Sequence, residues 1–142
     1  MDKLTPDDAF ELGNQFRDAA IALGDWRIRN RASLSKAQWD ELDNQEITLL
    51  NTASSIYTRA IGLVLADSQP ALERLQTSVK DAKSAVNHIV GLKQALDLAS
   101  ALVLLAGAVY SGNAAAIPAA IVALEDAAEA IALSYDPGSK QG

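Results

Sequence analysis

The sequence predicts an all-α fold, an antiparallel bundle of about four helices, and three observations support it. Apolar residues recur at steps of three and four along most of the chain, as on one face of a helix. The composition is 49% hydrophobic and only 5% aromatic, and its dominant residues, Ala and Leu, favour helices. No segment alternates apolar and polar residues as a half-buried strand does. A chain of 142 residues predicts one domain, residues 1–135, followed by a disordered tail, 136–142.

The first helix is expected near residues 6–30. Thr5 and Asp8 have the spacing of a capping box, and Pro6 stands where a missing backbone donor is tolerated. Three arginines collect at the far end, where positive charge suits the helix dipole. One apolar line indicates one buried face: Ala9, Leu12, Phe16, Ala19, Leu23 and Trp26.

The second helix is expected at residues 36–66, with Ser35 as its cap and Gln38 three residues later. Glu46 falls on the otherwise apolar line of this helix. That line consists of Trp39, Leu42, Leu49, Ala53, Ile56, Ala60 and Leu63.

A single long helix is expected over residues 69–110, opened by Ser68 and Pro70 and forming the centre of the bundle. Its heptad pattern is typical of a coiled coil and persists for roughly 40 residues, about 60 Å of helix. The two apolar lines are Leu72, Val79, Val86, Lys93, Ser100 and Gly107, and Leu75, Ala82, Ile89, Leu96, Val103 and Tyr110.

The last helix is expected at residues 114–134, after a break in which Gly112 ends one helix and Asn113 caps the next. Pro118 falls within its first turns or marks a later start. Together with the end of the long helix it forms an apolar C-terminal hairpin, about residues 95–124.

No charged residue lies between Asp97 and Glu125, so this hairpin lacks the wet face of a soluble helix. Burial in the core, in an oligomer or in a membrane would explain it. Each uncharged limb is shorter than the roughly 20 residues of a membrane span. In outline the hairpin resembles the apolar one that helical pore-forming toxins fold against a bundle when soluble. The candidates for self-association or membrane contact are Leu98, Leu102, Leu105, Val109, Ile117 and Ile121.

The composition argues against several classes of function. The absence of Cys excludes disulfides, thiolate nucleophiles and Cys-ligated zinc. A net charge of −6 argues against non-specific nucleic-acid binding. The N-terminus is acidic without an apolar run, so we expect no secretory signal and favour a cytoplasmic location, with signal-less secretion left open.

Catalytic motifs are also missing from the sequence. His88 is the only histidine, and it is interpreted as a surface or boundary residue. The acidic segment from Asp40 to Glu46 has neither the Glu-x-x-His pairs of a di-iron bundle nor the glycine of an EF-hand loop. We find no phosphate-binding loop and no GxSxG motif. We therefore expect no enzymatic activity, no cofactor and no metal.

What remains is segregated charge, a basic cluster after the first helix and an acidic segment in the second. Pairing within the chain, contact with a partner and anion binding would each explain the cluster. The sequence favours a non-enzymatic helical protein-interaction module that forms a homo-oligomer and binds a protein, the alternative being a soluble protein whose hairpin enters a membrane. Charge reversal in the cluster is expected to weaken partner binding without unfolding the chain. The partner-binding candidates are Arg27, Arg29, Arg31, Trp39, Asp40 and Asp43.

Overall fold

The computed structural model describes residues 4–59 and 69–134 and confirms the all-α class, because those residues contain no strand. The five α-helices there are α1 (Pro6–Arg29), α2 (Lys36–Arg59), α3 (Gln69–Ala85), α4 (Leu92–Ser111) and α5 (Ile117–Ser134). Three short 3-10 turns accompany them: η1 (Arg31–Ser33), η2 (Val86–His88) and η3 (Ala114–Ala116). The predicted end of the second helix beyond residue 59, the Ser68 cap and the tail 136–142 lie outside the described residues.

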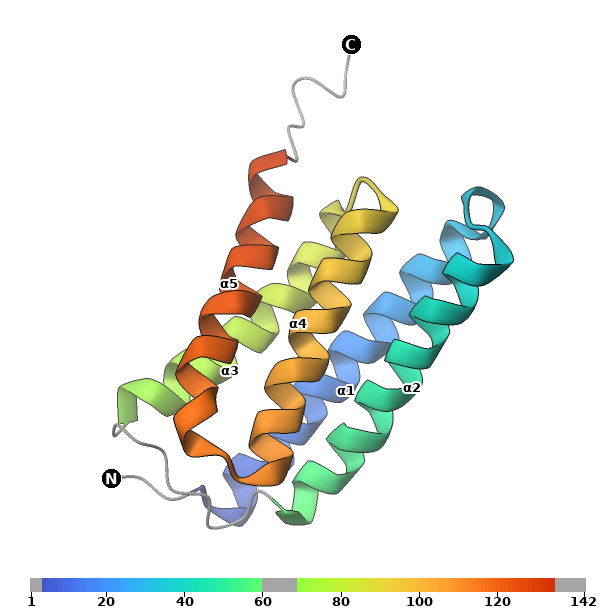
Figure 1. Ribbon diagram of the computed structural model, residues 1–142. Coiled ribbons are helices and arrows are strands. Elements are labelled where there is room, and N and C mark those ends of the chain that lie inside the picture. The colour runs from blue at the N-terminus through green and yellow to red at the C-terminus, as the bar shows by residue number, and fades with distance from the viewer. Residues whose placement is uncertain (1–3, 60–68, 135–142) are drawn as a thin grey trace.

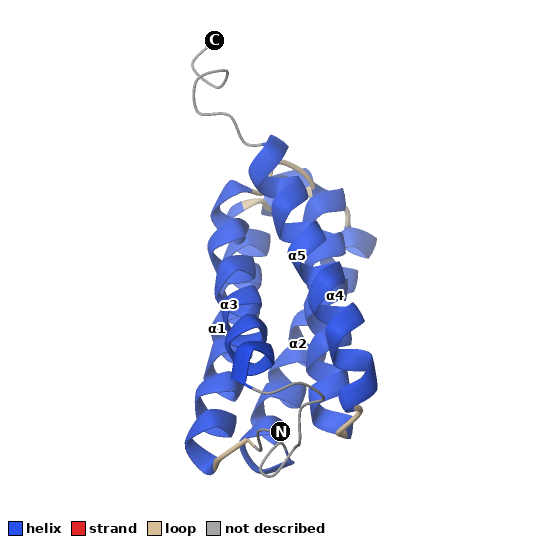
Figure 2. Cartoon of the chain, turned by 90° about the vertical axis from the view of Figure 1, so that its left-hand side faces the viewer, coloured by secondary structure: helices blue, strands red, loops and turns tan. Residues whose placement is uncertain are grey.

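The helices pack as a ring around one hydrophobic core. Figure 1 shows α1 and α2 as an antiparallel hairpin beside a second antiparallel pair, α4 and α5. α2 packs against α4, and α3 closes the ring by packing against both α1 and α5, as the side view in Figure 2 also shows. All five helices contribute buried apolar side chains to the core.

The first two helices begin where the sequence predicts. The Thr5 hydroxyl accepts the Asp8 N–H at 3.1 Å, and the Asp8 carboxylate accepts the Thr5 N–H at 3.0 Å. Ser35 and Gln38 repeat this exchange before α2, at 3.1 Å and 2.8 Å. Both capping boxes are therefore confirmed, and each satisfies two backbone donors that the first helical turn leaves open.

The single long helix over residues 69–110 is wrong, because the chain turns back between Ala85 and Leu92. A run of β-branched residues around Ile89 has low helix propensity, and Gly91, in an extended conformation, starts the next helix. The Gln94 side chain accepts the Val90 N–H at 3.0 Å. A helix of about 60 Å would also overhang α1 and α2, whose 24 residues span about 36 Å, whereas folding back covers both halves.

The predicted heptad lines hold for α3 and fail for α4. Leu72, Leu75 and Val79 are buried as expected. In α4, Ser100 and Tyr110 are exposed and Val103 only half-buried, although the pattern placed all three inside. The reversal starts a new helix with its own rotation, so the periodicity of one helix does not carry into the next. The residues of α4 that enter the core are Ala95, Leu98, Ala99, Ala101, Leu102, Leu105, Ala106, Ala108 and Val109.

The uncharged stretch is only partly hidden within the chain. Leu104 is 59% exposed and Val122 is 43% exposed. Ser100 and Ser111 of α4 are exposed as well. Small and hydroxyl side chains thus provide a solvent-facing surface that carries no charge, which a count of charged residues cannot detect.

Of the two cap residues predicted for the turn before α5, one is confirmed. Gly112 ends α4 with a φ of 72°, in the left-handed region that favours glycine. Asn113 makes no side-chain cap, contrary to expectation. η3 comes first, and Pro118 is the second residue of α5, where its missing N–H costs nothing.

Gly13 of α1 lies where the backbone of α2 approaches closely. A Cβ atom at Gly13 would stand 3.0 Å from the backbone oxygen of Ala53 and 2.8 Å from a ring carbon of Tyr57. We expect Gly13→Ala to destabilise the protein by about 1–3 kcal/mol in a urea titration, despite the higher helix propensity of alanine. Gly107→Ala is the matched control, because a Cβ there meets nothing within 4 Å and should stabilise α4 by up to about 1 kcal/mol. If Gly13→Ala instead stabilised the protein, α1 and α2 would be able to move apart at this position at little cost.

Candidate functional site

The partner-binding candidates gather at one end of the bundle. Three of them come from the end of α1 and from η1, and the other three come from the first two turns of α2. The antiparallel hairpin of α1 and α2 brings these segments together at its tip (Figure 1). They nevertheless have different environments, and this decides which of them a partner can reach.

Arg27 is buried and paired within the chain. Its Nη2 lies 2.8 Å from the Glu46 carboxylate and 3.3 Å from that of Asp43, and its residue exposure is only 9%. The guanidinium carbon lies 4.2 Å from the centre of the Trp39 ring, a cation–π distance. Arg27 and Asp43 therefore join α1 to α2. For Arg27, this agrees with the interpretation that the basic cluster pairs within the chain.

In the sequence, Glu46 falls on the otherwise apolar line of the second helix. Its position in the structure explains why a charged residue stands there. It faces Arg27 across the hairpin, next to Gly24 of α1. A Cβ atom at Gly24 would collide with the Glu46 carboxylate. The missing side chain at residue 24 thus makes room for the ion pair, a role that the sequence pattern did not reveal.

The remaining candidates stay accessible. Arg29 and Arg31 are exposed and form no ion pair with another described residue. The Arg31 guanidinium lies 5.4 Å from the centre of the Trp39 ring. Asp40 is paired with Lys36 one turn earlier, at 2.9 Å. A hollow of about 240 Å³ opens here, lined by Arg31, Leu34, Ser35, Lys36 and Trp39.

The hairpin candidates lie inside the bundle. Their exposed fractions are 0% for the four residues of α4 and 3% for the two of α5, namely Leu98, Leu102, Leu105, Val109, Ile117 and Ile121. Helices of this same chain cover them, so a second chain or a membrane reaches them only when α4 and α5 leave the bundle.

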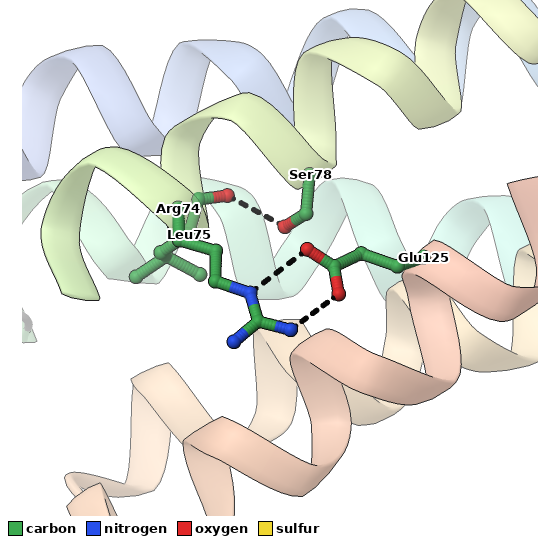
Figure 3. A network of polar contacts seen from close by, with 4 residues as sticks. All are labelled: Arg74, Leu75, Ser78 and Glu125. Atoms are coloured by element: carbon green, nitrogen blue, oxygen red, sulfur yellow. Dashed lines mark hydrogen bonds and ion pairs between the residues drawn. The ribbon is translucent and has the colours of Figure 1, made fainter. Parts of the chain in front are cut away.

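A groove between α3 and α5, of about 420 Å³, contains His88. Its polar lining includes Asp81, Ser84 and Glu129. At one end the Arg74 guanidinium donates two hydrogen bonds to Glu125, at 2.9 Å and 2.6 Å, while Ser78 donates to the Leu75 carbonyl (Figure 3). The hydrogen bond from Arg74 lowers the pKa of Glu125, burial partly opposes this, and the positive charge of Arg74 adds to it.

The lowered pKa of Glu125 predicts a pH-dependent contribution to stability. A carboxyl group whose pKa is lower in the folded than in the unfolded protein stabilises the fold at pH values above its unfolded pKa. This stabilisation is lost as the pH falls through its folded pKa. In urea titrations at about pH 7 we expect Glu125→Gln to lower the free energy of unfolding. This loss should become progressively smaller as the pH falls toward about 3. The effect is modest, since the side chains are 55% and 36% exposed and water screens their interaction. Glu129→Gln is the control, because it breaks no ion pair among the described residues. An equal cost for Glu125→Gln at both pH values would contradict this account.

A second polar hollow, between α1 and α3, was missed in the sequence. It also has a volume of about 420 Å³, and polar residues line it throughout: Gln15, Asp18, Lys80, Lys83, Ser84 and Asn87. Gln15 is buried, and its carbonyl oxygen has no hydrogen-bond partner among the described residues. Gln15 lies on the face of α1 next to α3, and only the packing of the two helices reveals this polar position.

The described residues contain no group of three or more His, Asp or Glu side chains that could hold a metal ion. One described helix, α4, is long and apolar enough to cross a membrane, and half of its most apolar window is buried in the bundle. The chain has no significant match to a family model, to a curated protein or to a solved structure.

Proposed function

We propose that this chain is a non-enzymatic protein-interaction module that self-associates and binds a protein partner through the tip of the α1–α2 hairpin. The observation that carries the proposal is the placement of Trp39, whose ring lies against two arginines beside an open hollow. Trp and Arg are the residue types most enriched where interfaces gain their binding energy. Here they are held in position before any partner arrives, which lowers the entropy cost of binding.

The charges at the tip favour an acidic partner. The carboxylates of Asp40 and Asp43 are engaged by Lys36 and Arg27. Arg29 and Arg31 carry exposed positive charge in a protein whose net charge is −6. An acidic segment carrying an apolar side chain would meet the arginines and place that side chain against Trp39. Such a contrast in charge orients an approaching partner and makes association sensitive to salt.

Photo-cross-linking from the tip tests this proposal. A photoreactive amino acid at Ala32, exposed in η1, should give a protein adduct in cells of the source organism. The same label at Ala123, exposed on α5, is the control and should not give that adduct. Combining the Ala32 label with Arg29→Glu and Arg31→Glu should abolish the adduct and leave the far-UV spectrum unchanged. An adduct that survives both reversals, or none at all, would contradict a partner site at the tip.

The α4 helix supports the alternative, a membrane-active hairpin. Its 20 residues match the length of a membrane span, although half of it is buried here. Insertion would require α4 to leave α2, to which the Gln45 and Ser100 side chains link it at 3.3 Å. A short bis-maleimide bridge between Gln45→Cys and Ser100→Cys should abolish flotation with anionic vesicles if the hairpin inserts. Absence of flotation by the unbridged protein would exclude the alternative.

A further inference from the structure

The side of α1 that faces away from the core carries a line of exposed apolar residues. Phe10 is 60% exposed, Ile21 is 41% exposed and Ile28 is 60% exposed. They are separated by 11 and 7 residues, close to three and two full turns, so they project from one side of the helix. In Figure 2 α1 lies at the edge of the bundle, with no other element outside it.

This line borders α2, which adds a fourth apolar residue. The ring of Phe10 lies 5.4 Å from that of Tyr57, which places the line at the junction of the two helices. Ile47 is 47% exposed and follows Asp43, the partner of Arg27, by one turn. Four of the nine large exposed apolar side chains among the described residues therefore lie on this outer hairpin face, while the other five are spread over the loop before α4, α4 itself and α5. A concentration of this kind marks an interaction surface.

Charges along α1 indicate what covers the face. Arg17 stands one turn before Ile21 and Asp25 one turn after it, so both flank the apolar line. Both are exposed, and neither forms an ion pair with another described residue. If a second copy packs its α1 antiparallel, about a two-fold axis at Ile21, each Arg17 faces the Asp25 of the other copy. The charge pattern is thus complementary to itself under the commonest symmetry of protein dimers.

We propose that the outer hairpin face binds a second copy of this chain, with the two α1 helices antiparallel and crossing at Ile21. Ile21 packs on its own counterpart, and the Arg17–Asp25 pairs on either side set the register. This inference rests on the self-association in the proposed function and names the surface for it. This face adjoins the hairpin tip at Ile28, whereas the Trp39 ring and the hollow beside it belong to η1 and the start of α2, beyond the end of α1, and are left for a protein partner.

Charge exchange with sedimentation equilibrium tests the two-fold arrangement. The unmodified protein should dimerise, more weakly as salt increases. Arg17→Glu alone, or Asp25→Arg alone, makes both pairs repulsive and should raise the dimer dissociation constant by about ten-fold or more. The double variant, and an equimolar mixture of the two single variants, restore opposite charges at every contact and should dimerise again. Asp126→Arg on α5 makes the same charge change elsewhere and should have no effect.

The possible failures are distinguishable. An unmodified protein that stays monomeric at all concentrations would overturn both this surface and the self-association in the proposed function. Dimers that persist in both single variants, or are not restored by the double variant, would overturn the surface alone and leave self-association standing. Circular dichroism of each variant confirms that the comparison concerns folded chains. An adduct at Ala32 reports on the partner site only when its mass is that of a different protein and not of a second copy of this chain.

Discussion

Leu102→Glu is expected to prevent the chain from folding. Leu102 is completely buried, in the segment of α4 whose inner face forms the core with α2 and α5. An ionised carboxylate there would stand among the apolar side chains of the core, away from water. The cost is several kcal/mol, comparable to the whole stability of a domain of this size. Far-UV circular dichroism and urea titration measure it.

The same helix provides a matched control. Leu104 lies two residues further on and is 59% exposed, so Leu104→Glu should leave stability within about 0.5 kcal/mol of the original. Leu105, which is fully buried, should behave like Leu102. If Leu102→Glu and Leu104→Glu were equally harmless, the orientation of α4 described above would be wrong. If both were equally harmful, the exposed face of α4 at Leu104 would have to be covered by another part of the protein or by a second chain.

Arg27→Glu is expected to lower the free energy of unfolding by about 3–5 kcal/mol, the second largest effect after Leu102→Glu. It replaces the cation between Asp43 and Glu46 with a third carboxylate, in a place where the Arg27 side chain is only 11% exposed. The sequence suggested that reversal here would spare the fold, and for Arg27 the structure leads to the opposite expectation. The free energy of unfolding from urea titration is the measurement.

Two further variants separate the buried pair from surface charge. Arg29→Glu makes the same change on an exposed side chain at the end of α1, and should cost no more than about 1 kcal/mol. Arg27→Met alone leaves Glu46, whose side chain is only 17% exposed, without its cation. Adding Glu46→Leu should therefore recover part of the loss. A double variant as unstable as the sum of its single variants would show that the pair contributes through packing instead of charge.

The sequence-based predictions succeeded where the cause is local. The capping boxes at Thr5 and Ser35 depend on residues three apart, so their hydrogen bonds follow from the chain itself. The left-handed cap at Gly112 is local in the same way. The partner-binding candidates also lie together, because a short connection between two helices forces their adjoining ends to meet.

The predictions failed where residues far apart in sequence decide the outcome. The apolar spacing around Gly91 is compatible both with one long helix and with two helices that fold back. The limited length of the neighbouring helices favours the second. Whether Arg27 is a surface charge or part of a buried pair depends on Glu46, which reaches it from another helix across Gly24.

The sequence by itself determined the helical class, the starts of α1 and α2, and the clustering of charge at the hairpin tip. These depend on helix propensity and on hydrogen bonds within a turn, which act over at most four residues. The tertiary structure, together with the local signals at Ile89 and Gly91, decided the reversal before Leu92, and it alone decided the core face of α4 and the outer face at Ile21. Each of these depends on which surfaces the neighbouring helices cover, and helical periodicity gives the spacing of a face but not the element that packs against it.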